Sequence, residues 1–210
     1  MMSVIDRSLP PSSGLIGHFD FPSVDRRRLS NGLDLRIALV PRLPVVSVRL
    51  FMRAGEAALP AHTAGLAALT AEALDGGTKK RTGRELADAL ESIGARFGAS
   101  AGWEGTSVSL YCLADRLEEG LTLLAEAVTQ PGFPSDEVER AQEQQIAGIQ
   151  QRSMDPGSLA SDVAISRYFE KAVPYSRPLD GTLESVAGLT RTDLIEYAAI
   201  NYRPENGGLV

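Results

Sequence analysis

The sequence predicts an α+β domain in which an antiparallel or mixed β-sheet packs against helices. Alternating apolar patterns, which indicate half-buried strands, occur at 33–40, 45–53 and 96–113. Segments with helical periodicity follow these strands in groups, so the sequence lacks the regular strand–helix alternation of a doubly wound fold. A hydrophobic fraction of 43% in 210 residues is enough to build one sizeable core.

Prolines and a Ser-Ser-Gly run occupy much of the first 24 residues, which show no periodicity. We therefore expect a flexible N-terminal arm over 1–24 and a single domain over 25–210. A turn at 206–208 precedes the beginning of a further strand. From this we expect the chain to be the first half of a longer, two-domain parent.

A β-hairpin is predicted around Asn31 and Gly32, because both residues tolerate the positive φ that a tight turn needs. Its second strand, 33–40, alternates apolar and polar residues, and we expect one face of it to be buried. The residues on that face are Leu33, Leu35, Ile37 and Leu39. The next strand, 45–53, alternates in the same way. Its core-facing residues are Val46, Val48, Leu50 and Met52.

A helix is predicted over 63–74 and ends at a Gly-Gly pair that supplies left-handed backbone. Thr82, with Glu85 three residues later, forms a capping box, so a second helix begins there and runs to about Ile93. Two paired strands follow, 96–101 and 106–113, joined by a turn. The remaining predicted helices cover 117–129, 135–151 with Ser135 as N-cap, 158–169 and 192–202.

Composition excludes several classes of function. The formal net charge of −6 argues against binding to nucleic acid or to an anionic membrane, because both need a basic surface. Cys112 is the sole cysteine, so the chain has neither an internal disulfide nor a cysteine-based zinc site. No apolar run reaches the roughly 18 residues of a membrane span. No signal peptide is recognisable, so we expect a cytoplasmic protein, with the periplasm left open.

Segment 65–78, GLAALTAEALDGGT, resembles the signature helix of the M16 zinc peptidases, the pitrilysin, insulinase and processing-peptidase family. In active members this helix reads G-L-A-H-x-x-E-H-x-L before a Gly-Thr turn. Segments 29–56 and 82–95 are similar to the strands before that motif and to the helix after it. The shorter matches are Gln130-Pro131-Gly132-Phe133, Asp155-Pro156 and Asn201-Tyr202-Arg203-Pro204-Glu205-Asn206. The resemblance covers 25–210 and implies the N-terminal domain of an M16 peptidase, with the LuxS/MPP-like metallohydrolase fold.

The metal-binding residues of the family are missing. In H-x-x-E-H the two histidines bind zinc and the glutamate takes a proton from the bound water. The matching residues here are Ala68, Ala71 and Glu72. Counting back from Asp155-Pro156 places Gly148 at the third ligand, a glutamate in the family, and Ala141 at a supporting glutamate. The resemblance therefore implies a non-catalytic member without zinc of its own.

Other residues offer no substitute for these ligands. His18 in the arm and His62 before the helix are the only histidines, and we interpret both as surface residues. His62 is ten residues from Glu72, about 15 Å along a helix. A glutamine-rich stretch at 142–151 could face a partner across a cavity, but we favour a solvated helix face.

Peptide binding is a second family property. In active members an extended substrate adds as a strand to the edge of the sheet, using backbone hydrogen bonds. The matching stretch runs from Phe97 through Gly98, Ala99 and Ser100 to Ala101, with Gly98 where many members have a substrate-contacting asparagine. A plain sheet edge is the alternative. Trp103, in the following turn, could contact a ligand or cover the end of the sheet.

The leading hypothesis is a non-catalytic M16 subunit or domain that pairs with a zinc-bearing M16 partner and helps enclose an extended peptide. Zinc is then expected only in the catalytic partner. The alternative is a structural scaffold subunit of a larger assembly, without a role in peptide handling. An active peptidase with unfamiliar ligands is the third reading, and the isolated domain could form a homodimer.

Overall fold

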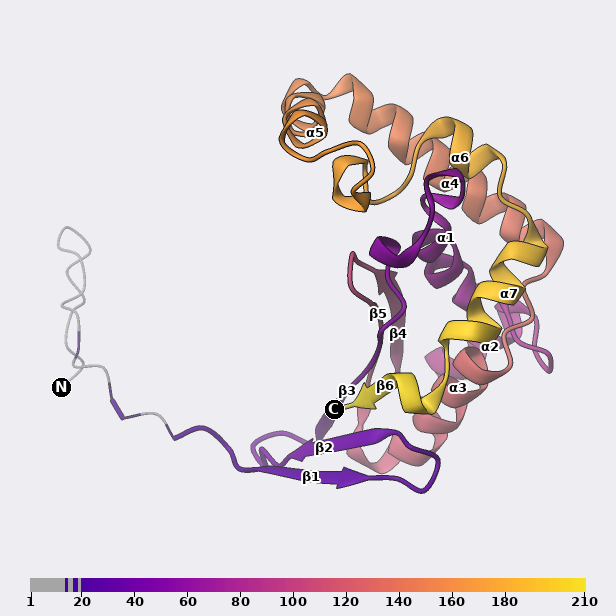
Figure 1. Cartoon of the computed structure of the whole chain (residues 1–210). Coiled ribbons are helices and arrows are strands. Elements are labelled where there is room, and N and C mark those ends of the chain that lie inside the picture. Colours follow the sequence, from indigo (N-terminus) through magenta and orange to yellow (C-terminus); the bar gives the residue numbers. More distant parts are fainter. Residues whose placement is uncertain (1–13, 15–16, 19) are drawn as a thin grey trace, which may run out of the picture.

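The computed structural model describes residues 14, 17–18 and 20–210. Residues 1–13, 15–16 and 19, which make up most of the predicted arm, lie outside the described residues. Six strands form one sheet in the order β1-β2-β6-β3-β5-β4 (Figure 1). The strands are β1 (Val24–Arg28), β2 (Asp34–Ala38), β3 (Val45–Met52), β4 (Arg96–Ala101), β5 (Thr106–Leu113) and β6 (Gly207–Leu209). β2 and β6 are parallel and the other neighbours antiparallel, so the α+β fold with a mixed sheet is confirmed.

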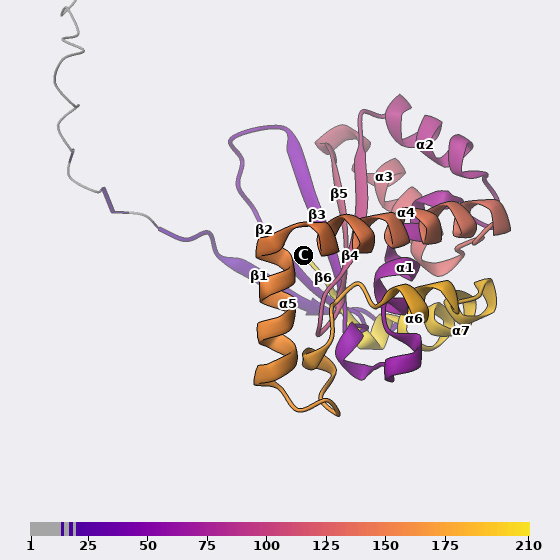
Figure 2. The same cartoon turned by 90° about the horizontal axis from the view of Figure 1, so that it is seen from above.

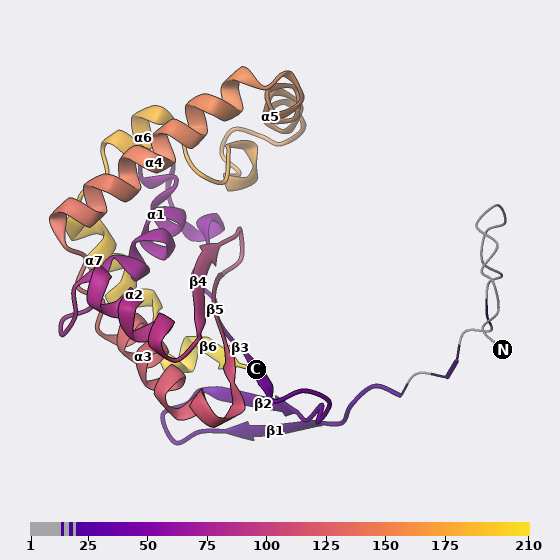
Figure 3. The same cartoon turned by 180° about the vertical axis from the view of Figure 1, so that it is seen from behind.

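The helices lie mainly on one side of the sheet, and the other side is left open (Figures 1 and 3). They are α1 (Leu66–Glu72), α2 (Gly83–Ser92), α3 (Leu117–Thr129), α4 (Ser135–Met154), α5 (Pro156–Tyr168), α6 (Leu183–Ala187) and α7 (Arg191–Asn201). α5 turns sharply away from the end of α4 (Figure 2) and extends over the open side. None of these helices, within the part of the chain that the structure describes, is long and apolar enough to cross a membrane.

The hydrophobic core lies between the sheet and the helices that cover it. In β3 the predicted alternation is confirmed, because Val48, Leu50 and Met52 are buried while the residues between them are exposed. In β5, Val108 and Leu110 are completely buried and face α3 from the same side of the sheet. Burying this apolar surface is the main source of stability for such a domain.

The expectation of a buried face on the strand 33–40 is wrong for its second half, whereas Leu33 and Leu35 are half-buried. Ile37 is 45% exposed and Leu39 is 76% exposed. The reason is the position of β2, which lies with β1 beyond the region that the helices cover (Figure 1). The period-2 pattern identifies the strand correctly, but the extent of its cover depends on helices that pack elsewhere.

The capping box at Thr82 is confirmed, with Glu85 and Thr82 bonded reciprocally. α1 begins at Leu66, three residues later than predicted, because Gly65 adopts a left-handed φ of 90°. At the start of α4 the predicted cap is wrong: Pro134 occupies the N-cap position and Ser135 is already helical, without a side-chain cap.

The sequence prediction missed α6. Thr182 caps this helix and Ser185 returns the hydrogen bond, so a serine takes the place of the usual glutamate in the capping box. Glycine and proline in the preceding segment are loop signals, so the sequence analysis assigned the start of this helix to a loop.

Candidate functional site

Helix α1, which carries the degenerate motif, is fixed at its N-cap residue, Gly65, by contacts from three segments. The Gly65 N–H donates to the Glu56 carboxylate at 3.0 Å, and the Gln145 side chain donates to the Gly65 carbonyl at 3.1 Å. The same amide also donates to the Asp180 carbonyl at 2.8 Å. A Cβ at position 65 would lie 2.5 Å from that carbonyl, so the site requires glycine for space as well as for its positive φ.

The motif residues of α1 face the long helix α4 across a cavity of about 290 Å³. Ala68 and Glu72 lie one turn apart on one side of it. Gly148, at the predicted third-ligand position, lies on the opposite side. The remaining lining residues are Ala141, Gln144, Gln145, Ile149 and Asp180. The structure therefore brings together residues 68, 72, 141 and 148, which are far apart in the sequence.

Ala71, at the position of the general base, is 2% exposed and is not among the residues that line this cavity. Its methyl group has no acid–base chemistry to offer. Glu72 is exposed, and its carboxylate lies in the electrostatic field of Arg140 on α4. A single carboxylate whose charge is partly balanced by a nearby arginine binds a metal ion only weakly.

The donor set at this cavity does not fit a zinc ion. Zinc in proteins takes three or four nitrogen, sulfur or carboxylate ligands in a closed geometry. Two of the three ligand positions here end in a methyl group or a hydrogen atom, at Ala68 and Gly148. Within the described ranges, no cluster of three or more His, Cys, Asp or Glu residues could hold a metal. His62 is exposed, and His18 lies 2.8 Å from Asp20 in the N-terminal segment; neither lines the cavity.

A buried ion pair lies next to the start of α1, where the Glu56 carboxylate accepts from the Gly65 N–H. Glu56 is 1% exposed, and its carboxylate lies 3.2 Å from the Arg177 guanidinium. The same guanidinium donates to the backbone carbonyls of Glu56 and Leu59. Burial raises the pKa of Glu56, and the hydrogen bonds from Gly65 and Arg177 oppose that shift. Sequence reasoning missed this pair, because 121 residues separate its members and neither stands in a recognisable motif.

The turn after α1 is held by a second buried carboxylate. Glu126 of α3 accepts hydrogen bonds from the Thr78 hydroxyl and the Arg81 guanidinium. These donors stabilise the charged form, and the hydrogen bond from Thr78 is the main cause of the lowered pKa of Glu126. Both ends of the degenerate motif helix are thus anchored by carboxylates that sequence analysis does not single out.

The predicted peptide-binding stretch forms β4, which is the last strand of the sheet. Within the described residues, the backbone of Phe97–Ser100 makes backbone hydrogen bonds only to β5. Beyond the strand, the edge is covered, because Glu56 and Ala57 donate to the carbonyls of Gly102 and Trp103. Among the described residues, the outer edge of β4 therefore has no backbone hydrogen-bond partner along Gly98, Ala99 and Ser100.

Trp103 takes part in an aromatic cluster that joins the β4–β5 turn to the segment after α5. Its ring lies 4.9 Å from Tyr175, which in turn lies 5.9 Å from Phe169. The Tyr175 hydroxyl donates to Glu104 in the same turn. Trp103 thus fixes the overhanging α5 segment to the end of the sheet.

The glutamine stretch of α4 is only in part the solvated face that we favoured. Gln142 donates to the carbonyls of Val186 and Leu189, and Gln145 bridges Gly65 and Asp180. These amides fasten α6 and its preceding loop to α4. Gln150 and Gln151 are exposed.

Solved structures of other proteins share this fold. A crystal structure of a peptidase M16 inactive domain from Pseudomonas fluorescens superposes with a TM-score of 0.83 at 29% identity, over 89% of this chain and 45% of that one. A protease from Helicobacter pylori shares the fold, with a TM-score of 0.80 at 18% identity over 90% of this chain and 46% of that chain.

Curated sequence relatives include zinc proteases and processing peptidases. An uncharacterized zinc protease of Mycobacterium leprae is 29% identical over 87% of this chain and 41% of its own length. The probable mitochondrial-processing peptidase subunit beta of Schizosaccharomyces pombe is 27% identical over 88% of this chain and 40% of its own length. The chain thus spans about two fifths of the length of the relatives that it matches.

The family description "Insulinase (Peptidase family M16)" matches residues 39–177. That range includes the motif helix α1, the edge strand β4 and the long helix α4 that faces α1 across the cavity. The chain belongs to peptidase family M16.

Proposed function

We propose that this chain is a non-catalytic M16 domain that pairs with a zinc-bearing M16 subunit or domain and helps to enclose a peptide. The observation that carries the proposal is the cavity between α1 and α4, where Ala68 and Gly148 stand at ligand positions and Glu72 supplies one carboxylate. The scaffold of the metal site is kept, while its ligands are absent.

The roles given to two similar proteins support the pairing. The Pseudomonas fluorescens neighbour is described as an inactive M16 domain, and the Schizosaccharomyces pombe relative as the beta subunit of a processing peptidase. A domain that keeps the fold but lacks the metal ligands can still help to enclose the peptide, while a partner supplies the zinc and the hydrolysis.

The open edge of β4 supports the peptide role. Strand addition uses backbone groups, which Gly98, Ala99 and Ser100 offer as well as any other residues. A Cβ at Gly98 would meet only the Ser109 hydroxyl, at 3.7 Å, so glycine is not required there by crowding. On this account the chain binds peptide backbone and leaves hydrolysis to the partner.

The experiment is co-expression of this chain with a zinc-bearing M16 subunit from the same organism. We expect the two to co-purify in a stable complex, and peptide hydrolysis to be at least about tenfold faster for the complex than for either component alone. Replacing the first histidine of the partner's motif by alanine is the control and abolishes hydrolysis without breaking the complex. A complex that forms but has no effect on peptide binding or cleavage would favour the scaffold alternative, and hydrolysis by this chain alone would refute the proposal.

A further inference from the structure

The open face of the sheet is rich in arginine although the whole chain carries a formal net charge of −6. Strand alternation and register assign the side chains to this face, which is the one opposite to the buried Leu50 and Val108. Five arginines from four strands belong to it, and Asp34 is the sole carboxylate on those strands there. The arginines are Arg26, Arg28, Arg36, Arg49 and Arg96.

The arginine placement follows from the register of the strands. Asp34 is paired with Gly208 and Gly208 with Phe51, an exposed residue on the open side of β3. Arg36, two residues after Asp34, therefore shares this face, and so does Arg26, its direct partner on β1. Nearer the β4 edge of the same face, Arg49 is paired with Ser109 and Arg96 with Tyr111. Their backbones are therefore two strand spacings apart and offset by two residues along the strands, about 12 Å in all.

These side chains have little counter-charge within the protein. Arg28 lies 4.0 Å from Asp34, at the limit of an ion pair. In the described part of the chain, Arg26, Arg36, Arg49 and Arg96 have no carboxylate within ion-pair distance. Arg26 and Arg36 stand directly opposite each other on neighbouring strands, an arrangement of like charges that destabilises a sheet. An anionic ligand would relieve this repulsion.

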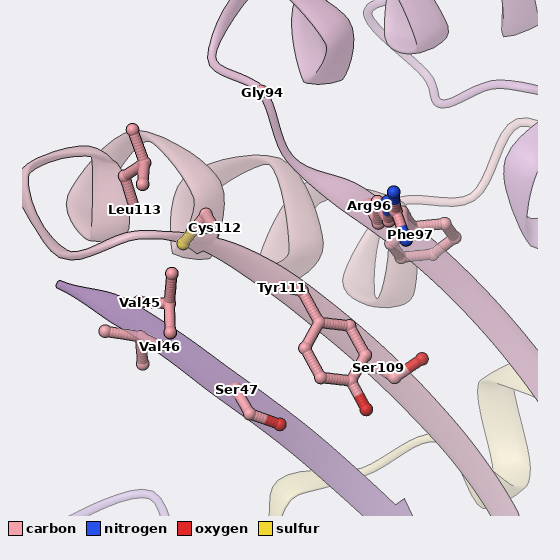
Figure 4. Close-up of a pocket in the computed structure, with 10 residues that line it drawn as sticks. All are labelled: Val45, Val46, Ser47, Gly94, Arg96, Phe97, Ser109, Tyr111, Cys112 and Leu113. Carbon is pink, nitrogen blue, oxygen red and sulfur yellow. The ribbon is translucent and has the colours of Figure 1, made fainter. Parts of the chain in front are cut away.

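A groove of about 630 Å³ opens on the same face, where β3, β5 and β4 lie side by side (Figure 4). Ser47 and Tyr111 contribute hydroxyl groups, and Arg96 contributes the charge. The Ser109 hydroxyl already donates to the Gly98 carbonyl. Val45 and Leu113, 58% and 47% exposed, provide apolar surface. No carboxylate lines the groove. Hydroxyl donors, one guanidinium and an apolar floor are suited to a carboxylate-bearing peptide rather than to a cationic one.

The geometry points to an extended acidic peptide as the ligand of this face, with Arg49 and Arg96 binding its side-chain carboxylates. An extended peptide presents alternate side chains on one face about 7 Å apart, so one such segment reaches both arginines. The inference rests on the proposed function and names the class of peptide that the chain handles. The proposed role in peptide handling favours a peptide over the other polyanion that an arginine face could attract, a single-stranded nucleic acid.

Fluorescence anisotropy of labelled dodecapeptides tests the inference on the purified chain. The probes alternate threonine with glutamate, lysine or glutamine. We expect the glutamate peptide to bind at least about tenfold more tightly than the lysine peptide in low salt, and the preference to vanish near 0.5 M salt, where exposed charges are screened.

The variant Arg49→Gln with Arg96→Gln is expected to weaken binding of the glutamate peptide by about fivefold. The matched control, Lys79→Gln with Arg84→Gln, removes the same charge from the helical side and is expected to leave binding unchanged. Circular dichroism checks that each variant is folded.

Equal affinity for the three peptides, a preference for the lysine peptide, or equal effects of the two double variants would overturn the inference. Tighter binding of a labelled twelve-residue oligothymidylate than of the glutamate peptide would identify the face as a nucleic-acid site and overturn it as well. These outcomes are separate from the pairing experiment. A chain that pairs with a zinc-bearing subunit but ignores peptide charge keeps the proposed function and loses this inference.

Discussion

Replacing Glu56 with alanine is expected to lower the free energy of unfolding by about 3–5 kcal/mol, because it leaves the Arg177 guanidinium charged and without its partner. Arg177 is only 15% exposed, and the lost carboxylate also accepts from the Gly65 N–H. The start of α1 therefore loses a hydrogen bond at the same time. Urea unfolding followed by circular dichroism measures the effect.

Two comparisons isolate the cause of this loss. Glu91→Ala removes an exposed carboxylate from α2 and is expected to change stability by less than about 0.5 kcal/mol. The double variant Glu56→Ala with Arg177→Met removes the unpaired charge and is expected to be more stable than Glu56→Ala alone. If the double variant were less stable than the single one by the full additive amount, the two residues would not be coupled.

Zinc binding is expected to appear when the family's ligands are installed. The variant Ala68→His, Glu72→His and Gly148→Glu supplies three ligands around the cavity between α1 and α4. A Cβ at position 148 meets nothing within 4 Å, so the glutamate has room. We expect inductively coupled plasma mass spectrometry to find about one zinc ion per chain in this variant and almost none in the unmodified chain. Adding Ala71→Glu supplies the base and is not needed for binding.

The control for this variant moves the third ligand to the neighbouring position. Ala147→Glu is combined with the same two histidines, on an exposed residue that does not line the cavity. Its side chain leaves α4 about 100° around the helix, so we expect zinc to be held much more weakly. Equal zinc content in the two variants would show that residue 148 does not face residues 68 and 72.

The local elements could be predicted from the sequence because their signals are local. The alternation of β3, the capping box at Thr82 and the Asn31-Gly32 turn each depend on a few adjacent residues, and the structure has all three. The N-cap of α4 could not be predicted from the serine alone. Pro134 takes the N-cap position, so Ser135 is already the first helical residue. The start of α6 was missed because its capping box has Ser185 where the recognisable pattern has glutamate or glutamine.

Long-range features were harder to predict. The counted position of Gly148 lies on the same cavity as Ala68 and Glu72, because one motif fixes the spacing along two helices. The Glu56–Arg177 pair and the bridging role of Gln145 depend on how segments far apart in sequence meet, and no periodicity reports this. The exposure of Ile37 depends on where the helices end, which is a property of the whole fold.

The zinc content of the unmodified chain is the most direct measure of the claim that this M16 scaffold no longer holds its metal. The purified chain is mixed with an equal amount of zinc, passed through a gel-filtration column and analysed for metal and for peptide hydrolysis. We expect less than about 0.1 zinc ion per chain and no hydrolysis. About one zinc ion per chain, retained on the column and accompanied by hydrolysis that a chelator stops, would contradict the account.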